Sequence, residues 1–220
     1  QRMRGDIAGM GAVKTALSNG EATVNVAITA GKAVADMLTE MKAKTVQANQ
    51  AGLDTASRDA LQNDFTSLRN QLETIVQTAE FNGKNLITTG ASALTVLSTV
   101  DGSTISVTAQ IMNATALGLD TSTLANASGA ATALTSIDAA INSVTSSLAS
   151  LGSSSKRIDV QSEFTVQLVD ILKEGVGNLV DADLAEESAS LQSLQIKQQL
   201  GVQALSIANS GPQSILALFG

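Results

Sequence analysis

One hydrophobic pattern runs without interruption through residues 134–179, LTSIDAAINSVTSSLASLGSSSKRIDVQSEFTVQLVDILKEGVGNL. Its positions recur at alternating steps of three and four residues, which is the spacing of a helix in a coiled coil. The positions are Leu134, Ile137, Ile141, Val144, Leu148, Leu151, Ser155, Ile158, Ser162, Thr165, Val169, Leu172, Val176 and Leu179. Between residues 155 and 165 several of these positions, which form the seam of the coiled coil, are polar, but the spacing does not change. The stretch therefore predicts one very long coiled-coil helix.

Two earlier segments carry the same pattern and can supply partners for this helix. The first has the seam positions Leu17, Val24, Gly31, Leu38 and Thr45, together with Gly20, Ala27, Val34, Met41 and Ala48. We expect it to end with Gly52 as its C-cap. A second helix starts at Asp54 or Thr55 and ends near a turn at Asn82-Gly83. The predicted rod seam comprises Leu38, Leu61, Phe65, Leu68, Leu72, Ile137, Ile141, Val144 and Leu148.

The pattern changes between residues 93 and 110, where β-branched residues flank Asp101-Gly102. This arrangement predicts a β-hairpin. Residues 111–130 are rich in Ala, Thr, Ser and Asn, and we expect a loop and connector there. The predicted fold is mainly α: an elongated coiled-coil helical rod with a small β-hairpin region, plus a C-terminal core helix.

Composition excludes several classes of function. The net charge of the 220-residue chain is −7 and its 13 basic residues form no dense cluster, so nucleic acid is not an expected partner. No apolar stretch is long enough to span a membrane. The chain has no His and no Cys, which removes imidazole bases, thiolates and the commonest metal ligands. We therefore expect neither an enzyme nor a bound cofactor or metal.

The stretch LQSLQIKQQLGVQALSIA, residues 191–208, has apolar residues on two sides of a helix. Leu191, Leu194, Val202 and Leu205 form one stripe, and Ile196, Leu200 and Ile207 form another about 180° away. We expect an interruption at residues 177–188 before this helix and a stop at Gly211-Pro212 after it. One core needs only one apolar face, so the second face predicts partners outside the chain. A membrane-surface helix would place Lys or Arg beside one face, and here Lys197 stands alone.

Three polar features have ordinary interpretations. Asp181, Asp183, Glu186 and Glu187 could form a calcium cluster, but acids in a first helical turn offset the helix dipole. Ser153 and Lys156 match the Ser-x-x-Lys spacing of penicillin-recognising enzymes without their companion motifs, so a polar coiled-coil seam is favoured. The Ser/Thr run at 121–136 could carry sugars, although such runs usually indicate only an exposed loop.

The C-terminal residues 178–219 resemble the carboxy-terminal segment of bacterial flagellin. They share an Asp181-Ala182-Asp183 hinge, followed by Ala208-Asn209, Pro212-Gln213 and Ile215-Leu216. Residues 78–86, TAEFNGKNL, resemble the family's Phe-Asn-Gly turn, and residues 98–120 resemble its small β-hairpin. The C-terminal sequence is most similar to flagellins of alphaproteobacteria.

The resemblance implies a secreted subunit that polymerises with itself into the extracellular flagellar filament used for swimming. It implies a helical rod from residues 1–90 and 131–178, a hairpin and connector at 91–130, and a core helix at 179–220. Filament packing would involve Leu184, Leu191, Leu194, Ile196, Leu200, Val202, Leu205, Ile207, Ile215, Leu216 and Phe219. A flagellin export chaperone and the flagellar export apparatus are the expected partners. Because residue 1 is Gln, we expect a fragment or processed form. Residues 1–20 resemble family sequence well inside the first conserved domain, so the resemblance implies that the amino-terminal core helix is absent.

Many flagellins carry a Leu-Gln-Arg-x-Arg-Glu-Leu stretch that a vertebrate toll-like receptor recognises. The corresponding stretch here is Leu38-Thr39-Glu40-Met41-Lys42-Ala43-Lys44, in which Glu40 reverses a charge and Lys42 is a partial match. Because Lys does not replace Arg where bidentate contacts matter, we expect weak or no receptor activation. A soluble coiled-coil adapter and a hook–filament junction protein remain as alternative functions.

Overall fold

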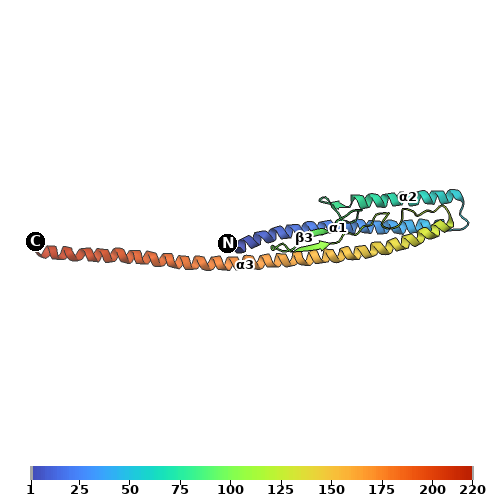
Figure 1. The fold of residues 1–220 in the computed structure, drawn as a ribbon. Coiled ribbons are helices and arrows are strands. Elements are labelled where there is room, and N and C mark those ends of the chain that lie inside the picture. The colour runs from blue at the N-terminus through green and yellow to red at the C-terminus, as the bar shows by residue number, and fades with distance from the viewer. Residues whose placement is uncertain (1, 220) are drawn as a thin grey trace. The chain divides into compact units, whose positions relative to one another are not determined.

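The computed structural model describes the backbone of residues 2–219, and the side chains of that range except at positions 181, 183 and 209–219. The chain divides into two units, residues 5–168 and residues 1–4 with 169–220. Within residues 5–168, helices α1 (Arg2–Ala48), α2 (Thr55–Thr78) and the first part of α3 (Ala127–Phe219) lie side by side with a hairpin (Figure 1). The predicted mainly α fold with a small β-hairpin region is confirmed.

Helix α1 buries the seam that the heptad pattern predicts. All of its predicted positions, from Leu17 to Ala48, are buried, together with Val13 and Thr23. Several of these positions are Gly, Ala or Thr, so neighbouring elements approach the helix closely. The expectation of Gly52 as the C-cap is wrong, because α1 ends at Ala48 and a side chain from α2 binds the carbonyl of that last residue.

Helix α2 begins as predicted, with Asp54 as its N-cap. The Asp54 carboxylate accepts hydrogen bonds from the backbone N–H of Ser57 at 2.9 Å and from its hydroxyl at 2.7 Å. These bonds, the backbone one foremost, lower the pKa of Asp54. The helix is followed by strands β1 (Glu80–Phe81) and β2 (Lys84–Asn85), joined by the predicted Asn82-Gly83 turn with φ values of 49° and 75°.

Strands β3 (Leu94–Leu97) and β4 (Thr104–Val107) form the predicted antiparallel hairpin, with Leu94 opposite Val107 and Leu97 opposite Thr104. Its connection is longer than a two-residue turn. The N–H of Gly102 donates to the carbonyl of Thr99 at 3.3 Å, and Gly102 adopts a φ of 89° that favours glycine. Alternate residues of the hairpin, Val96, Ile105 and Val107, are buried in the core.

Helix α3 starts at Ala127, where the Asn126 side chain accepts the N–H of Gly129 at 2.7 Å and caps the helix. It then continues to Phe219, so the expected interruption at 177–188 and the expected stop at Gly211-Pro212 are both wrong. Residues 177–188 contain Ala, Leu and Glu, which favour helices and outweigh the cost of about 1 kcal/mol for Gly177. A proline inside a helix removes one backbone hydrogen bond and costs about 3 kcal/mol, yet the helical backbone continues past position 212.

Candidate assembly surfaces

The predicted rod seam lies in the core of residues 5–168. Five of its residues are completely buried at 0% exposure: Leu38, Phe65, Leu72, Ile137 and Val144. The other four are partly buried and pack against that core: Leu61, Leu68, Ile141 and Leu148. On α3 the two groups alternate, so one side of its heptad faces the centre of the core and the other lies at the edge. The seam is thus occupied within the chain and offers little apolar surface to other molecules.

Two glycines of α1 mark where other elements come closest. A Cβ atom on Gly20 would lie 2.5 Å from Cγ2 of Val96 in β3. A Cβ atom on Gly31 would lie 2.8 Å from Cδ2 of Leu148 in α3. Both distances are below any normal carbon–carbon contact, so no larger residue fits without movement. The glycines therefore fix how closely the hairpin and α3 pack against α1.

Arg58 closes one end of α1, a role that its position in the sequence does not reveal. Its side chain reaches back from α2 and donates to the carbonyl of Ala48, and to the carbonyl of Gln50 at 3.0 Å. Only 7% of Arg58 is exposed. The guanidinium satisfies the carbonyl of Ala48, which has no partner within the helix, and shares the carbonyl of Gln50 with the N–H of Leu53. In the sequence, Arg58 is only a basic residue that follows the polar N-cap Asp54, and this pattern is too common to predict the contact with α1.

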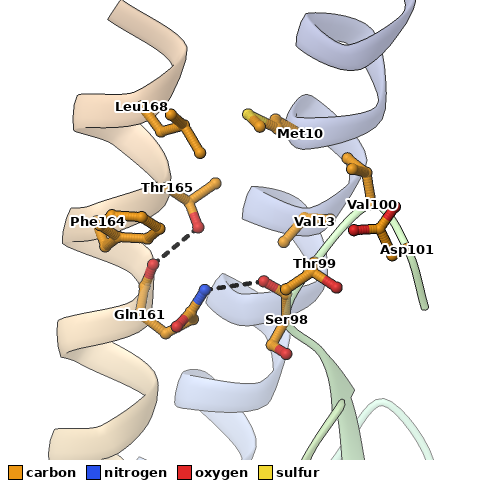
Figure 2. Close-up of a pocket in the computed structure, with 10 residues that line it drawn as sticks. All are labelled: Met10, Val13, Ser98, Thr99, Val100, Asp101, Gln161, Phe164, Thr165 and Leu168. Carbon is orange, nitrogen blue, oxygen red and sulfur yellow. Dashed lines mark hydrogen bonds between the residues drawn. The ribbon is translucent and has the colours of Figure 1, made fainter. Parts of the chain in front are cut away.

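A small cavity opens beside the loop of the β3–β4 hairpin, and we call it the hairpin-loop cavity (Figure 2). Its volume is about 170 Å³. It is lined by Met10 and Val13 of α1, by Ser98, Thr99, Val100 and Asp101 of the hairpin loop, and by Gln161, Phe164, Thr165 and Leu168 of α3. Met10 and Leu168 point towards one another across the space between α1 and α3 in Figure 2.

Three of the polar residues that line this cavity, Ser98, Gln161 and Thr165, donate hydrogen bonds within the chain. The side-chain amide of Gln161 donates to the carbonyl of Ser98 at 2.9 Å, which ties the hairpin loop to α3. The hydroxyl of Thr165 donates to the carbonyl of Gln161 at 2.8 Å. The hydroxyl of Ser98 donates to the carbonyl of Ser103 at 3.0 Å, within the loop. The cavity presents mainly hydrocarbon surface, and Asp101 is the one charged residue of its lining.

The lysines in the stretch 38–44 are engaged in ion pairs between helices. Lys42 of α1 lies 2.7 Å from the Asp138 carboxylate of α3, and Lys44 lies 2.7 Å from that of Asp64 in α2. The hydrogen bond from Lys44 to Asp64 raises the pKa of Lys44. Leu38 is buried, so within this stretch its side chain is not available to another protein.

The unit that contains residues 169–220 has a different surface. Aliphatic side chains of α3 stand largely in solvent there, with exposed fractions of 52–71%. They are Leu184, Leu191, Leu194, Ile196, Leu200, Val202, Leu205 and Ile207. The predicted filament-packing residues Ile215, Leu216 and Phe219 fall on side chains outside the described residues. Because α3 is helical throughout this stretch, the side chains keep the two stripes that the sequence predicts.

The described residues give little support to a catalytic Ser-x-x-Lys site or to a metal site. Lys156 lies 2.8 Å from the Asp159 carboxylate, and this hydrogen bond raises the pKa of Lys156. A lysine that acts as a base in a Ser-x-x-Lys site needs a lowered pKa instead. Among the described side chains, no group of His, Cys, Asp or Glu could hold a metal ion. Asp181 and Asp183 of the calcium alternative lie outside them.

None of the helices in the described part of the chain combines the length and the hydrophobicity that crossing a bilayer requires.

Comparison with known proteins supplies the family context for these surfaces. The model of the bacterial flagellin N-terminal helical region matches residues 1–92, and that of the C-terminal helical region matches residues 134–219. The chain is 49% identical to flagellin FljK of Caulobacter vibrioides, with 96% of the chain and 78% of the relative covered. It is 33% identical to flagellin C of Rhizobium meliloti, over 99% of the chain and 83% of the relative. The N-terminal match begins at residue 1, so the expected lack of an amino-terminal core helix is not confirmed.

Two solved structures have a similar fold. A Bacillus cereus flagellin superposes with a TM-score of 0.61 at 22% identity, covering 67% of this chain and 86% of the other. A putative flagellar hook-associated protein from Vibrio parahaemolyticus superposes with a TM-score of 0.66 at 16% identity, covering 80% and 94%. At these identities the likeness shows the fold alone.

Proposed function

Because the chain belongs to the bacterial flagellin family, we propose that the exposed aliphatic side chains of its α3 helix hold neighbouring subunits together. The chain is a structural subunit of the extracellular flagellar filament that serves swimming motility, and it polymerises with copies of itself. Relatives that are 48–49% identical to the chain are flagellins of Caulobacter vibrioides, so the chain is similar to flagellins of the alphaproteobacterial type.

The observation that carries the proposal is the exposure of the stripes on α3. Leu184, the first residue of the predicted packing set, is 60% exposed, and Leu205 is 71% exposed. Leaving so many aliphatic side chains in water is unfavourable, and burying one fully stabilises a complex by about 1.5–3 kcal/mol. Two stripes on one helix need two partners, as in a filament where each subunit is surrounded by others. Glutamines separate the stripes, which keeps the helix compatible with water before assembly.

Different parts of the chain would then have different roles. We assign residues 1–90 and 131–178 to the helical rod, residues 91–130 to a hairpin and connector, and residues 179–220 to the filament core. The buried seam supports a rod within residues 5–168, since these residues have an apolar core of their own, whereas residues 1–4 and 169–178 group with the C-terminal unit. The chain would work without catalysis, and its partners would be other subunits rather than nucleic acid.

Substitutions on each stripe test the proposal. We expect Leu194→Gln and Ile196→Gln each to shorten or abolish filaments in a flagellin-deficient bacterium that carries the variant gene, as seen by electron microscopy. Gln195→Ala lies between the two stripes and is the matched control, with filaments of normal length. Circular dichroism of the purified variants would show that the rest of the chain still folds. Normal filaments from both stripe variants would contradict the proposal.

Export before assembly gives the same helix an earlier partner. We propose that a flagellin export chaperone covers the exposed stripes in the cell and that the flagellar export apparatus then accepts the chain. The support is again the exposed surface, because an amphipathic helix typically binds in a groove of its partner. Co-purification of the full chain with a chaperone from its own bacterium, lost in Leu194→Gln, would test this.

Weak or absent activation of the toll-like flagellin receptor is the last part of the proposal. Lys42 and Lys44 are held by Asp138 and Asp64, and Glu40 presents a negative charge where many flagellins have arginine. Each feature reduces the positive charge available to a receptor. We expect purified protein to give a reporter-cell response far below that of a flagellin with the full motif, and Glu40→Arg to raise it. A potent response from the unaltered protein would contradict this.

The alternatives of a soluble adapter and a hook–filament junction protein have weaker support. The resemblance to a hook-associated protein is one of fold, at 16% identity. An adapter would fold completely alone, so limited proteolysis of the monomer distinguishes it from a flagellin. We expect cuts beyond Val180 before cuts within residues 10–168.

A further inference from the structure

The hairpin-loop cavity has the size and the chemistry of a site for one apolar side chain. Its volume of about 170 Å³ is close to that of an engineered protein cavity of about 150 Å³ that binds benzene. Its walls include Met10, Val100, Phe164 and Leu168. The surrounding amide and hydroxyl groups are already hydrogen-bonded. Apart from the Asp101 carboxylate, a polar ligand would therefore find few groups to bind, whereas a Leu, Ile or Phe side chain would bury its surface.

The edge of the cavity exposes an aromatic ring. Phe164 is 55% exposed, and Val100 and Val160 nearby are 42% and 52% exposed. Phe65, by contrast, is fully buried in the seam. The seam does not need Phe164, since Thr165 beside it takes the inward position of the heptad and is 4% exposed. An apolar rim around an apolar cavity on the same face is the arrangement expected of an interaction surface.

We propose that in the assembled filament the hairpin-loop cavity receives one aliphatic or aromatic side chain from a second copy of this chain. The inference rests on the proposed function, because polymerisation makes copies of the chain its constant neighbours. A stable protein interface buries about 1,200–2,000 Å², and one side chain buries far less. This contact would therefore add to the contacts that the stripes of α3 form and would not replace them.

The contact must join two different surfaces. If the cavity of one copy faced the cavity of the next, the pair would be isologous and would close as a dimer. An open filament needs heterologous contacts, in which a patch on one subunit binds a different patch on its neighbour. The guest side chain therefore comes from a surface other than the cavity rim. Gln161 acts as a positioning residue, because its bond to Ser98 holds the loop that forms one wall.

Single cysteines provide the test, because the chain contains no Cys of its own. Phe164→Cys and Val100→Cys place a thiol on two walls of the cavity, and Thr135→Cys places one on an exposed control position of α3. Each full-length variant is expressed in a bacterium without other flagellins. We compare the rate of thiol modification in isolated filaments with that in depolymerised monomers.

We expect modification of both cavity thiols to slow by roughly tenfold or more on assembly, because a filled interface excludes water, and the control thiol to change little. Equal rates in filament and monomer at both cavity positions would overturn the inference, as would equal protection of the control. Disulfide-linked dimers through Cys at 164 would overturn it too, since they indicate cavity facing cavity. If the unaltered chain forms no filament, the proposed function fails instead, so the two failures are distinguishable.

Discussion

Replacing Arg58 by methionine should destabilise the chain far more than replacing any exposed arginine. Methionine keeps much of the apolar stem but removes the guanidinium that donates to the carbonyls of Ala48 and Gln50. The side chain is only 7% exposed, so water cannot readily replace it. The carbonyl of Ala48 at the end of α1 would then have no partner, whereas the carbonyl of Gln50 would keep the N–H of Leu53 at 3.3 Å.

The magnitude follows from the contacts that are lost. A hydrogen bond from a charged group contributes about 1.5–3 kcal/mol, and a buried acceptor left without a partner costs about 1–3 kcal/mol. Some relaxation will occur, so we expect a loss of about 2–4 kcal/mol in the free energy of unfolding. For a chain of this size that corresponds to a fall in Tm of roughly 5–15 °C.

Thermal unfolding of the full-length variant, followed by circular dichroism at 222 nm as the usual helix signal, measures the effect. Arg157→Met is the matched control, because Arg157 is exposed on α3 and should change Tm by only a degree or two, about the range of surface substitutions. Arg58→Lys should fall between the two, since lysine cannot donate to both carbonyls with the geometry of a guanidinium. If Arg58→Met unfolds at the same temperature as Arg157→Met, the contact with α1 contributes nothing and the reasoning fails.

Two further predictions concern a close approach and a helix cap. Gly20→Ala should lower the free energy of unfolding, measured in urea, by about 1–3 kcal/mol, because its Cβ would lie 2.5 Å from Val96. Gly152→Ala is the control: no atom lies within 4 Å of its Cβ, so it should raise the free energy of unfolding by about 0.5–1 kcal/mol. If Gly152→Ala destabilises the chain, the added methyl group does not fit beside Gly152 and the reasoning is contradicted. The lowered pKa of Asp54 in the folded chain means that its cap stabilises α2 above about pH 4 and that this contribution is lost as pH falls further. Asp54→Asn keeps an acceptor without the titration, so its stability between pH 5 and pH 2 should fall less steeply, and equal slopes would contradict the assignment.

Much of the fold follows from the sequence because heptads and turns are local signals. The seam of α1 could be predicted residue by residue, since a spacing of three and four determines which side of a helix is buried. The turns at Asn82-Gly83 and Asp101-Gly102 could be located because glycine supplies a positive φ in each. In both cases the residues that specify the structure are neighbours in the sequence.

The errors arose where local composition was given too much weight. The acidic and glycine-containing residues 177–188 suggested an interruption, yet α3 remains helical there, and the segment contains one glycine among residues that include the helix formers Ala, Leu and Glu. The cap by Arg58 could not be predicted, because it depends on how the turn between α1 and α2 brings a side chain back by ten residues. The hairpin-loop cavity was missed for the same reason, since it combines α1, the hairpin and α3.

The buried seam and the exposed stripes give folding and assembly separate apolar surfaces. The seam residues are buried within the chain, so residues 5–168 have their own core before any subunit binds. The stripes on α3 remain exposed, and their free energy of burial becomes available only in the filament. Association itself costs on the order of 4–15 kcal/mol, which one aliphatic side chain at about 1.5–3 kcal/mol cannot offset alone. Several contacts must therefore form together, so the loss of a single one, at about 2 kcal/mol, should weaken subunit binding roughly thirtyfold. A subunit whose contacts are individually weak and jointly sufficient remains a monomer until a filament end presents all of its partners at once.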